Sequence, residues 1–261
     1  MGQMLGNKND KSMDGGNPLW RDLILTSGIL LVVIPLISLY ALYLGRTLYA
    51  PGYPRDATSY LLLVSQHQRL FSLAWSLWIV TDFLGIAPVV AIYNVLQRHN
   101  RAFALLGSLL AIFYAIYDVS ATELNSLALV SLSHGYAGAT TEALRASFVA
   151  AATYGYNALP LQTVLSFGIG SLGYLLWCVS MWKSVFGRWT AIFGIVVNIL
   201  GVVGAASPVV PSSSILGICF FLAPRLIAFW SIILGIQLLR YVGRLPKHVS
   251  TEYLASQGNP A

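Results

Sequence analysis

The sequence has very little charge. Lys and Arg number 15 and Asp and Glu number 9, so charged residues make up 9% of the 261 positions, against about 25% in soluble domains. A soluble fold of this length needs far more charge to cover its surface. The sequence is instead 57% hydrophobic. The composition therefore excludes an ordinary soluble protein and places most of the chain in lipid.

Histidine and lysine are absent from the middle of the apolar runs, and cysteine is rare in the whole sequence. The two cysteines, Cys178 and Cys219, lie in apolar runs, as buried small hydrophobes do, and no disulfide is expected. No histidine lies in the middle of an apolar run, which excludes a membrane cytochrome, and no lysine lies in one, which excludes a retinal Schiff base. We therefore predict no catalytic residue, no metal and no cofactor. One metal site stays open as an alternative, from His67, His134 and Glu123 near the outer face.

Six apolar runs are long enough to cross a bilayer, which takes about 20 residues. They cover residues 23–44, 70–96, 102–121, 159–182, 189–206 and 215–239. Residues 1–22 are rich in Gly, Asn, Asp and Lys, so we predict a disordered tail there, and residues 241–261 form a second polar tail. The sequence thus predicts an all-α, six-transmembrane-helix bundle.

The basic residues predict the orientation of this bundle. Ten Lys and Arg side chains fall on the side of the two termini and four on the other side, and cytoplasmic loops carry the excess of Lys and Arg. We therefore expect a protein of the cytoplasmic membrane with both termini in the cytoplasm. The net charge of +6 follows from this distribution, so no nucleic-acid partner is predicted. The expected partners are the lipid bilayer and a small-molecule or lipid ligand, and self-association stays open.

Two of the outer connections have helical patterns of their own. Residues 55–69 place Ala57, Tyr60, Leu61 and Val64 on one stripe, which predicts a short interfacial helix before the second span. Residues 123–134 continue the period of the third span beyond the membrane. The Gly-rich stretch 135–138 then breaks the pattern, and residues 141–153 predict another short surface helix.

Ionisable residues inside predicted spans are the strongest functional signal, since each costs about 2.5–3.5 kcal/mol to insert. Asp82 lies roughly 18 Å along the second span and Arg225 roughly 15 Å from the outer end of the sixth, at similar depth. A guanidinium cannot relieve its cost by losing a proton. We therefore expect Arg225 to pair with Asp82, with Asp118 as the second choice. A purely structural ion pair is the alternative, and Glu123 is placed at the outer interface.

Further polar residues fall at the same outer depth. Tyr114, Tyr117, Asp118, Thr122 and Asn125 recur at helical spacing, so they share one face that favours a wet cavity. Asn157 and Gln162 begin the fourth span, and Trp78 follows the spacing of Asp82. The predicted ligand-binding set is Asp82, Arg225, Asp118, Tyr114, Tyr117, Asn157, Gln162 and Trp78. In the fifth span, small residues at Gly194, Gly201 and Ala205 predict a close helix contact.

Several segments resemble a known family. They are an extracytoplasmic helix leading into LFSLAW, an acid in TDFLG, the turn NRAFALLG, and the runs YGYNALPLQTVLSFGIGSLGYLLW and RWTAIFGIVVNILG. Over residues 21–244 the sequence is similar to the prokaryotic membrane proteins grouped as domain of unknown function 4386. That family has no established activity, so the resemblance implies a six-helix membrane fold.

Three functions are compatible with these observations. The leading hypothesis is a non-enzymatic protein that binds or conducts a small solute or lipid through an outward-facing polar cavity. The first alternative is an intramembrane enzyme acting on lipid or isoprenoid, with Asp82 or Asp118 as general acid or base. The second is a scaffold or partner subunit without a ligand, for which the small-residue stripes suffice.

Overall fold

The protein is a bundle of long helices. The structure, a computed structural model, describes residues 18–49, 54–210 and 212–244, and all regular elements in these ranges are helices. The long ones are α1 (Pro18–Leu48), α3 (Gln68–Leu96), α4 (Arg101–Tyr117), α6 (Glu142–Met181), α7 (Gly187–Ala205) and α8 (Ser214–Arg244). A short helix, α2 (Ala57–Gln66), precedes α3, and α4 continues through the π-helix η2 (Asp118–Glu123) into α5 (Leu124–Gly138).

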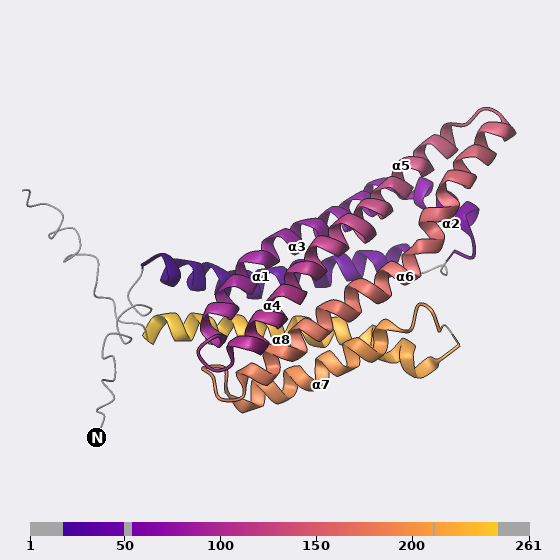
Figure 1. Cartoon of the computed structure of the whole chain (residues 1–261). Coiled ribbons are helices and arrows are strands. Elements are labelled where there is room, and N and C mark those ends of the chain that lie inside the picture. Colours follow the sequence, from indigo (N-terminus) through magenta and orange to yellow (C-terminus); the bar gives the residue numbers. More distant parts are fainter. Residues whose placement is uncertain (1–17, 50–53, 211, 245–261) are drawn as a thin grey trace, which may run out of the picture.

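Six of these helical stretches are long and apolar enough to cross a membrane, so the predicted all-α, six-span fold is confirmed. Most of the two predicted tails lies outside the described residues. The stretch Arg101–Gly138 has 38 residues and α6 has 40, so each is roughly 60 Å long, about twice the hydrocarbon thickness. Figure 1 shows α5 and the first part of α6 projecting past the other helices at one end.

The start of α6 differs from the prediction. The short surface helix expected over residues 141–153 is the first part of one continuous helix, which begins where the Thr141 hydroxyl accepts a hydrogen bond from the Leu144 amide at 3.2 Å. Pro160 lies within this helix without ending it. In long membrane helices neighbouring groups can satisfy the backbone atoms that a proline frees, so the expected boundary at residue 159 is absent.

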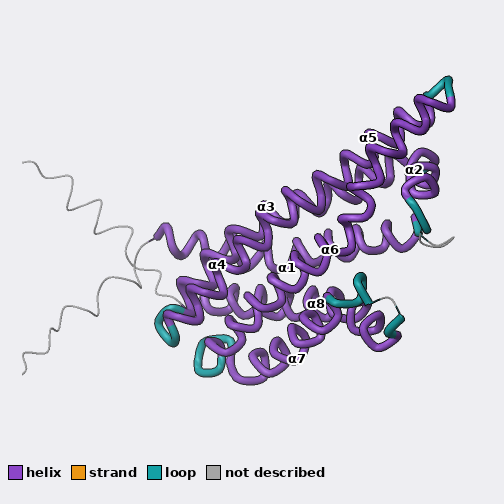
Figure 2. Tube along the Cα trace, turned by 45° about the vertical axis from the view of Figure 1, so that its right-hand side comes forward, coloured by secondary structure: helices purple, strands orange, loops and turns teal. Residues whose placement is uncertain are grey.

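The six long helices form a closed ring. Their most extensive contacts link them in the order α1, α3, α4, α6, α7, α8 and back to α1, and the contact between α3 and α4 is the least extensive of these six. Figure 2 shows the long helices running along one bundle. The described ends at Pro18 and Arg244 lie with the turns 97–100 and 182–186 at one end, which we call the terminal end, and α2 lies at the opposite end, the α2 end (Figure 1). The short turns 97–100 and 182–186 make α3 and α4, and likewise α6 and α7, antiparallel neighbours.

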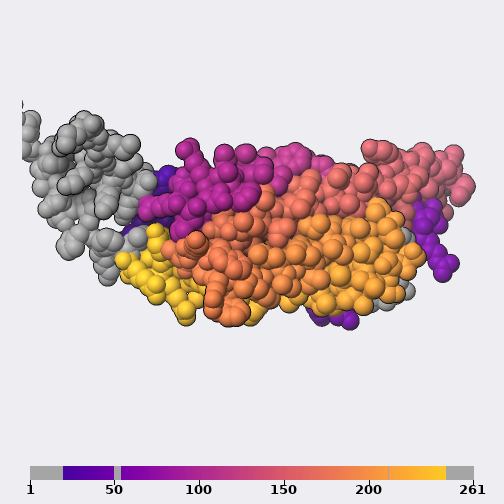
Figure 3. All heavy atoms as spheres, turned by 60° about the horizontal axis from the view of Figure 1, so that its bottom comes forward, coloured from indigo at the N-terminus to yellow at the C-terminus, as the bar shows by residue number. Residues whose placement is uncertain are grey.

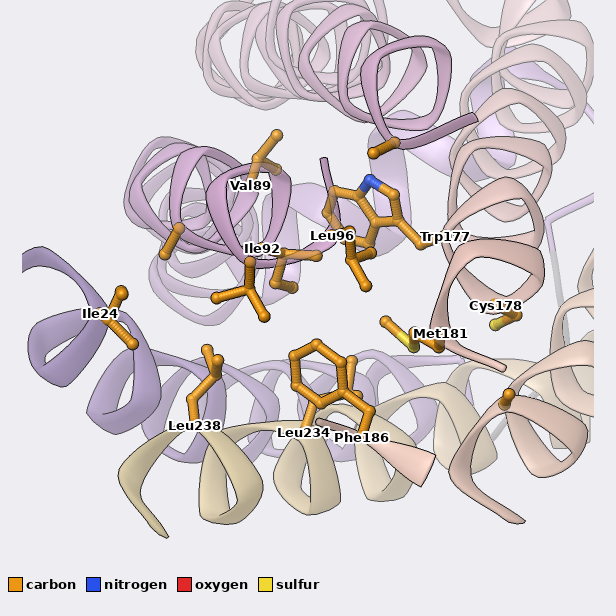
Figure 4. Packing of buried hydrophobic residues seen from close by; sticks show 14 of the residues in the cluster. Ile24, Val89, Ile92, Leu96, Trp177, Cys178, Met181, Phe186, Leu234 and Leu238 are labelled. Atoms are coloured by element: carbon orange, nitrogen blue, oxygen red, sulfur yellow. The ribbon is translucent and has the colours of Figure 1, made fainter. Parts of the chain in front are cut away.

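An apolar cluster fills the ring near the terminal end. It contains Ile24, Ile92, Met181 and Leu238, contributed by four different helices (Figure 4). The Trp177 indole next to them donates a hydrogen bond to the Ser108 hydroxyl at 3.1 Å. These side chains leave no wide passage at this end of the ring in the described conformation, since nearly all of them are fully buried.

Helix α2 closes part of the opposite end. The predicted stripe of Ala57, Tyr60, Leu61 and Val64 lies on one face of this helix, but it is buried against α5 and α6 rather than lying in the membrane interface. The helix begins at Asp56, whose carboxylate accepts a hydrogen bond from the Ser59 amide at 2.7 Å in a capping box.

The outside of the ring is apolar and the inside contacts are close. Figure 3 shows α6 and α7 packed side by side along the bundle, and many exposed side chains on both helices are large and apolar, such as Leu172 and Val196. On α7, a Cβ at Gly194 would collide with Cys178 of α6 and Trp230 of α8. The predicted close helix contact is therefore confirmed, and the exposed apolar surface is the part that faces lipid.

Candidate ligand cavity

The ring encloses a cavity of about 720 Å³. Most of its wall is apolar or aromatic, with Trp75 and Trp78 on α3, Tyr114 on α4, Tyr174 on α6 and Phe220 on α8. It extends from Tyr49 near the α2 end to residues that also belong to the apolar cluster near the terminal end, such as Trp177 and Leu234. The volume lies within the range of small-molecule sites, about 300–1,000 Å³.

Prolines mark the wall of this cavity. Pro35, Pro88, Pro160 and Pro224 lie inside α1, α3, α6 and α8 respectively, and all four line the cavity. A proline within a helix removes one backbone hydrogen bond and lets the helix bend. The cavity is therefore surrounded by the positions at which four helices of the ring can bend most easily.

Three carboxyl groups meet on one side of the cavity. Asp82 comes from α3, and Asp118 and Glu123 come from the two ends of η2. One carboxylate oxygen from each residue lies within 4.8 Å of the other two. The Tyr114 side chain lies beside both aspartates. The cavity therefore combines a large apolar wall with one strongly acidic patch, which we call the acidic cluster (Asp82, Asp118 and Glu123).

The π-helix brings two of these acids together. Residues five apart on an α-helix point about 140° apart, so Asp118 and Glu123 would face different sides of a regular helix. In η2 the Leu124 amide instead donates to the Val119 carbonyl, five residues earlier. This wider turn places Asp118 and Glu123 over one another. Single π-helical turns of this kind are frequent at functional sites.

The acidic cluster is buried and under-satisfied. Glu123 is 1% exposed and neither of its carboxylate oxygens has a hydrogen-bond partner, and Asp82 is 7% exposed with Oδ2 also without one. No Lys, Arg or His is among the side chains that line the cavity, all of which are described. Buried carboxylates without such partners are costly when ionised, so this arrangement calls for protons or for a bound cation.

Arg225 does not take the predicted place beside Asp82. Its guanidinium donates to the carbonyl of Phe221 in its own helix and lies 3.7 Å from the centre of the Phe221 ring, and Arg46 of α1 is the charged group that acts on it. No ion pair joins Arg225 to an acid among the described residues. The prediction is wrong because α1 lies between α3 and α8 in the ring. Matching depth did not mean adjacent helices.

The other predicted residues divide into two groups. Asp82, Asp118, Tyr114 and Trp78 line the cavity, whereas three others do not. Those three are Tyr117, which stacks on Phe113 with ring centroids 6.2 Å apart, Gln162, which accepts a hydrogen bond from Asn125 at 3.0 Å, and Asn157, which is exposed. Tyr117, Gln162 and Asn157 therefore do not line the cavity, although they were predicted to do so. For the four residues that line it, a ligand-binding role stays a prediction.

Glu123 is the functional candidate that the sequence placed wrongly. An uninterrupted α-helix puts it at the outer interface, but η2 turns it into the cavity. The open alternative of a metal site with His67 and His134 is not assembled in the described part of the chain, where His134 contacts Gln68 at 3.3 Å and Glu123 lies with the two aspartates. A sequence signal for the π-turn would be the lack of a strong helix former in Asp118–Thr122 apart from Ala121.

Fold and cavity together define a polytopic membrane protein, a six-helix ring around an internal pocket with an acidic patch. The chain belongs to the family described as Domain of unknown function (DUF4386), whose model matches residues 26–241. This agrees with the resemblance seen in the sequence. No curated protein and no solved structure matches the chain.

Proposed function

We propose that the protein binds a small amphipathic molecule or lipid inside the membrane, in the cavity of the helix ring. The observation that carries this proposal is the cavity itself, about 720 Å³ with mostly apolar walls and one acidic patch. Small-molecule sites have this character, with hydrophobic surroundings and a few polar groups that fix orientation. The apolar body of the ligand lies against the aromatic side chains, and its polar group reaches the acidic cluster.

Binding is better supported than conduction. The apolar cluster near the terminal end includes Ile92, Met181 and Leu238, which are fully buried (Figure 4). A solute crossing the membrane would have to pass through this packed region. The cavity therefore supports a binding pocket rather than a passage through the whole bundle.

The orientation of the pocket follows from the basic residues. Arg98, Arg101, Lys183 and Arg188 flank the turns at the terminal end. Since cytoplasmic loops carry the excess of Lys and Arg, we infer that the terminal end faces the cytoplasm. The end of the pocket near Tyr49 then lies toward the outer side of the cytoplasmic membrane.

A second candidate is an intramembrane enzyme that acts on lipid or isoprenoid. The acidic cluster favours it, because buried carboxyl groups beside an apolar pocket are suited to general acid–base chemistry. A scaffold without a ligand is less well supported, because a packed interior would serve it better than a cavity of this size.

Gly85 offers a direct test of ligand binding. It lines the cavity, one turn after Asp82, and a Cβ at this position would meet no atom within 4 Å. Gly85→Leu should therefore take up part of the cavity while favouring the helix by roughly 1 kcal/mol. We expect a neutral phenyl-diazirine photoprobe, added to membranes, to label cavity residues of the unsubstituted protein and to label them several-fold less in Gly85→Leu, as read by peptide mass spectrometry.

Gly45→Leu is the matched control. Gly45 is also a helical glycine with no atom within 4 Å of its Cβ position, but it does not line the cavity. Labelling of cavity residues in this variant should equal that of the unsubstituted protein, and labelling of lipid-facing Phe83 should be the same in all three. Cavity residues that stay unlabelled in the unsubstituted protein, or that label equally in Gly85→Leu, would overturn the proposal.

A further inference from the structure

The acidic cluster has the geometry of a cation site. Oxygen ligands surround Ca²⁺ at about 2.3–2.6 Å and Mg²⁺ at about 2.0–2.1 Å. Ligands on opposite sides of the ion are therefore about 4.6–5.2 Å apart for Ca²⁺ and about 4.0–4.2 Å apart for Mg²⁺. The three carboxylate oxygens of Asp82, Asp118 and Glu123 lie within 4.8 Å of one another, so they can share one ion with little or no movement of the helices.

The hydrogen bonding of these groups points to the same conclusion independently of their spacing. Glu123 is 99% buried, yet both of its carboxylate oxygens lack a hydrogen-bond partner. This side chain lines the cavity. Buried polar atoms are nearly always satisfied, so these unpartnered oxygens on the cavity wall are free to act as ligands.

The types of donor atom define the class of ion. Carboxylate and hydroxyl oxygens suit Ca²⁺, Mg²⁺ and Mn²⁺, whereas Zn²⁺ and copper favour imidazole and thiolate ligands. No His or Cys is among the residues that line the cavity. Three carboxylates and one divalent ion leave a single negative charge, where three ionised carboxylates alone would carry three.

We propose that Asp82, Asp118 and Glu123 bind one divalent cation of the oxygen-preferring class at the polar side of the cavity. This goes beyond the ligand binding proposed above, because the ion is held by the side chains of the protein alone. The π-turn η2 is then part of the site, since it sets Asp118 and Glu123 on the same side of the helix.

Terbium luminescence tests this site directly. Tb³⁺ prefers oxygen ligands as Ca²⁺ does, and its emission is excited through nearby aromatic groups, for which Tyr114 is well placed. The full chain would be reconstituted in nanodiscs of zwitterionic phosphatidylcholine and titrated with TbCl₃. We expect saturable emission that CaCl₂ or MnCl₂ displaces, and an affinity lower by roughly tenfold or more in Glu123→Gln and in Asp118→Asn.

Two further variants distinguish a site from a general loss of structure. Glu142→Gln makes the same chemical change at an exposed acid and should bind Tb³⁺ as the unsubstituted protein does. Glu123→Asp keeps a carboxylate and should bind more tightly than Glu123→Gln. The proposal is overturned if the unsubstituted protein shows no saturable emission, if no divalent ion displaces Tb³⁺, or if Glu123→Gln binds with unchanged affinity.

The outcome is separate from that of the proposed function. Photolabelling of the cavity needs no metal ion, and the terbium titration needs no organic ligand. Labelling of the cavity without terbium binding would overturn only the proposed cation site. Terbium binding without labelling would overturn only the proposed binding of an amphipathic molecule.

Discussion

At the scale of single residues, the acidic and basic side chains within the membrane spans have different surroundings. Asp82, Asp118 and Glu123 gather in one place around the cavity. Arg225 stands apart and uses its own helix, with a hydrogen bond to the Phe221 carbonyl and a cation–π contact with the Phe221 ring. The acids therefore depend on what the cavity holds, whereas the arginine is satisfied locally.

This separation predicts that Asp82 and Arg225 are energetically independent. In a double-mutant cycle with Asp82→Asn and Arg225→Met, the coupling free energy of unfolding in detergent should be below about 0.5 kcal/mol. Asn125→Ala with Gln162→Ala is a positive control, because these side chains share a hydrogen bond of 3.0 Å, worth about 0.6 kcal/mol in membrane proteins. A coupling above 1.5 kcal/mol between Asp82 and Arg225, the size of a buried ion pair, would contradict the observed geometry.

The residues also show what sequence reasoning can and cannot find. Asp82 and Asp118 are recognisable because any acid within a long apolar run is exceptional. Glu123 is not, because its side of the helix depends on the π-turn that precedes it. The partner of Arg225 could not be inferred from depth, since depth along a helix carries no information on which helices are neighbours.

At the scale of elements, the apolar patterns were sufficient to predict the long helices and the buried stripe of α2. The continuity of α6 through Pro160 was not predictable in the same way. A proline ends most helices in water, but within a bundle the groups around it decide whether the helix continues. Local sequence signals therefore predict where the helices lie, but they do not predict whether a helix is interrupted at a proline.

The start of α2 should depend on pH. The hydrogen bond from the Ser59 amide, followed by that from its hydroxyl, lowers the pKa of Asp56 below its ordinary value of 3.8. Because the folded pKa is the lower one, the stabilisation is present above the unfolded pKa and is lost as the pH falls through the folded pKa. Asp56→Ala should thus speed hydrogen exchange of the α2 amides at neutral pH and make no difference at strongly acidic pH.

Asp22→Ala serves as the comparison, since Asp22 lies in α1 and does not cap α2. Exchange of the α2 amides should be the same in this variant and in the unsubstituted protein at every pH. Equal exchange in Asp56→Ala and the unsubstituted protein at neutral pH would show that α2 is held by its buried stripe alone.

At the scale of the whole molecule, the ring depends on close contact between its first and last helices. Gly28 of α1 and Gly235 of α8 face one another, and a Cβ at Gly235 would lie 2.7 Å from the Gly28 carbonyl oxygen. Small residues allow such approach between membrane helices. The sequence predicts the number of spans, but their circular order arises from contacts between segments far apart in the chain.

Gly235→Ala should therefore weaken the ring. The added methyl group would force α1 and α8 apart, and we expect a loss of about 1–3 kcal/mol in the free energy of unfolding in detergent. Gly243→Ala is a matched change in the same helix where a Cβ meets nothing within 4 Å, and it should be neutral or stabilising by up to about 1 kcal/mol. Equal stability of the two variants would mean that α1 and α8 do not meet as closely as described.

The contact between α1 and α8 has a consequence for biosynthesis. One side of α1 packs against α8, which begins nearly two hundred positions later in the sequence. This side of α1 therefore has no neighbouring helix until α8 has been synthesised. Until α8 emerges from the ribosome, the side of the nascent bundle between α1 and α7 is open, and the buried acids of α3 and η2 lack their finished surroundings. Until α8 has been inserted, quality-control proteases would meet this protein as an unclosed bundle.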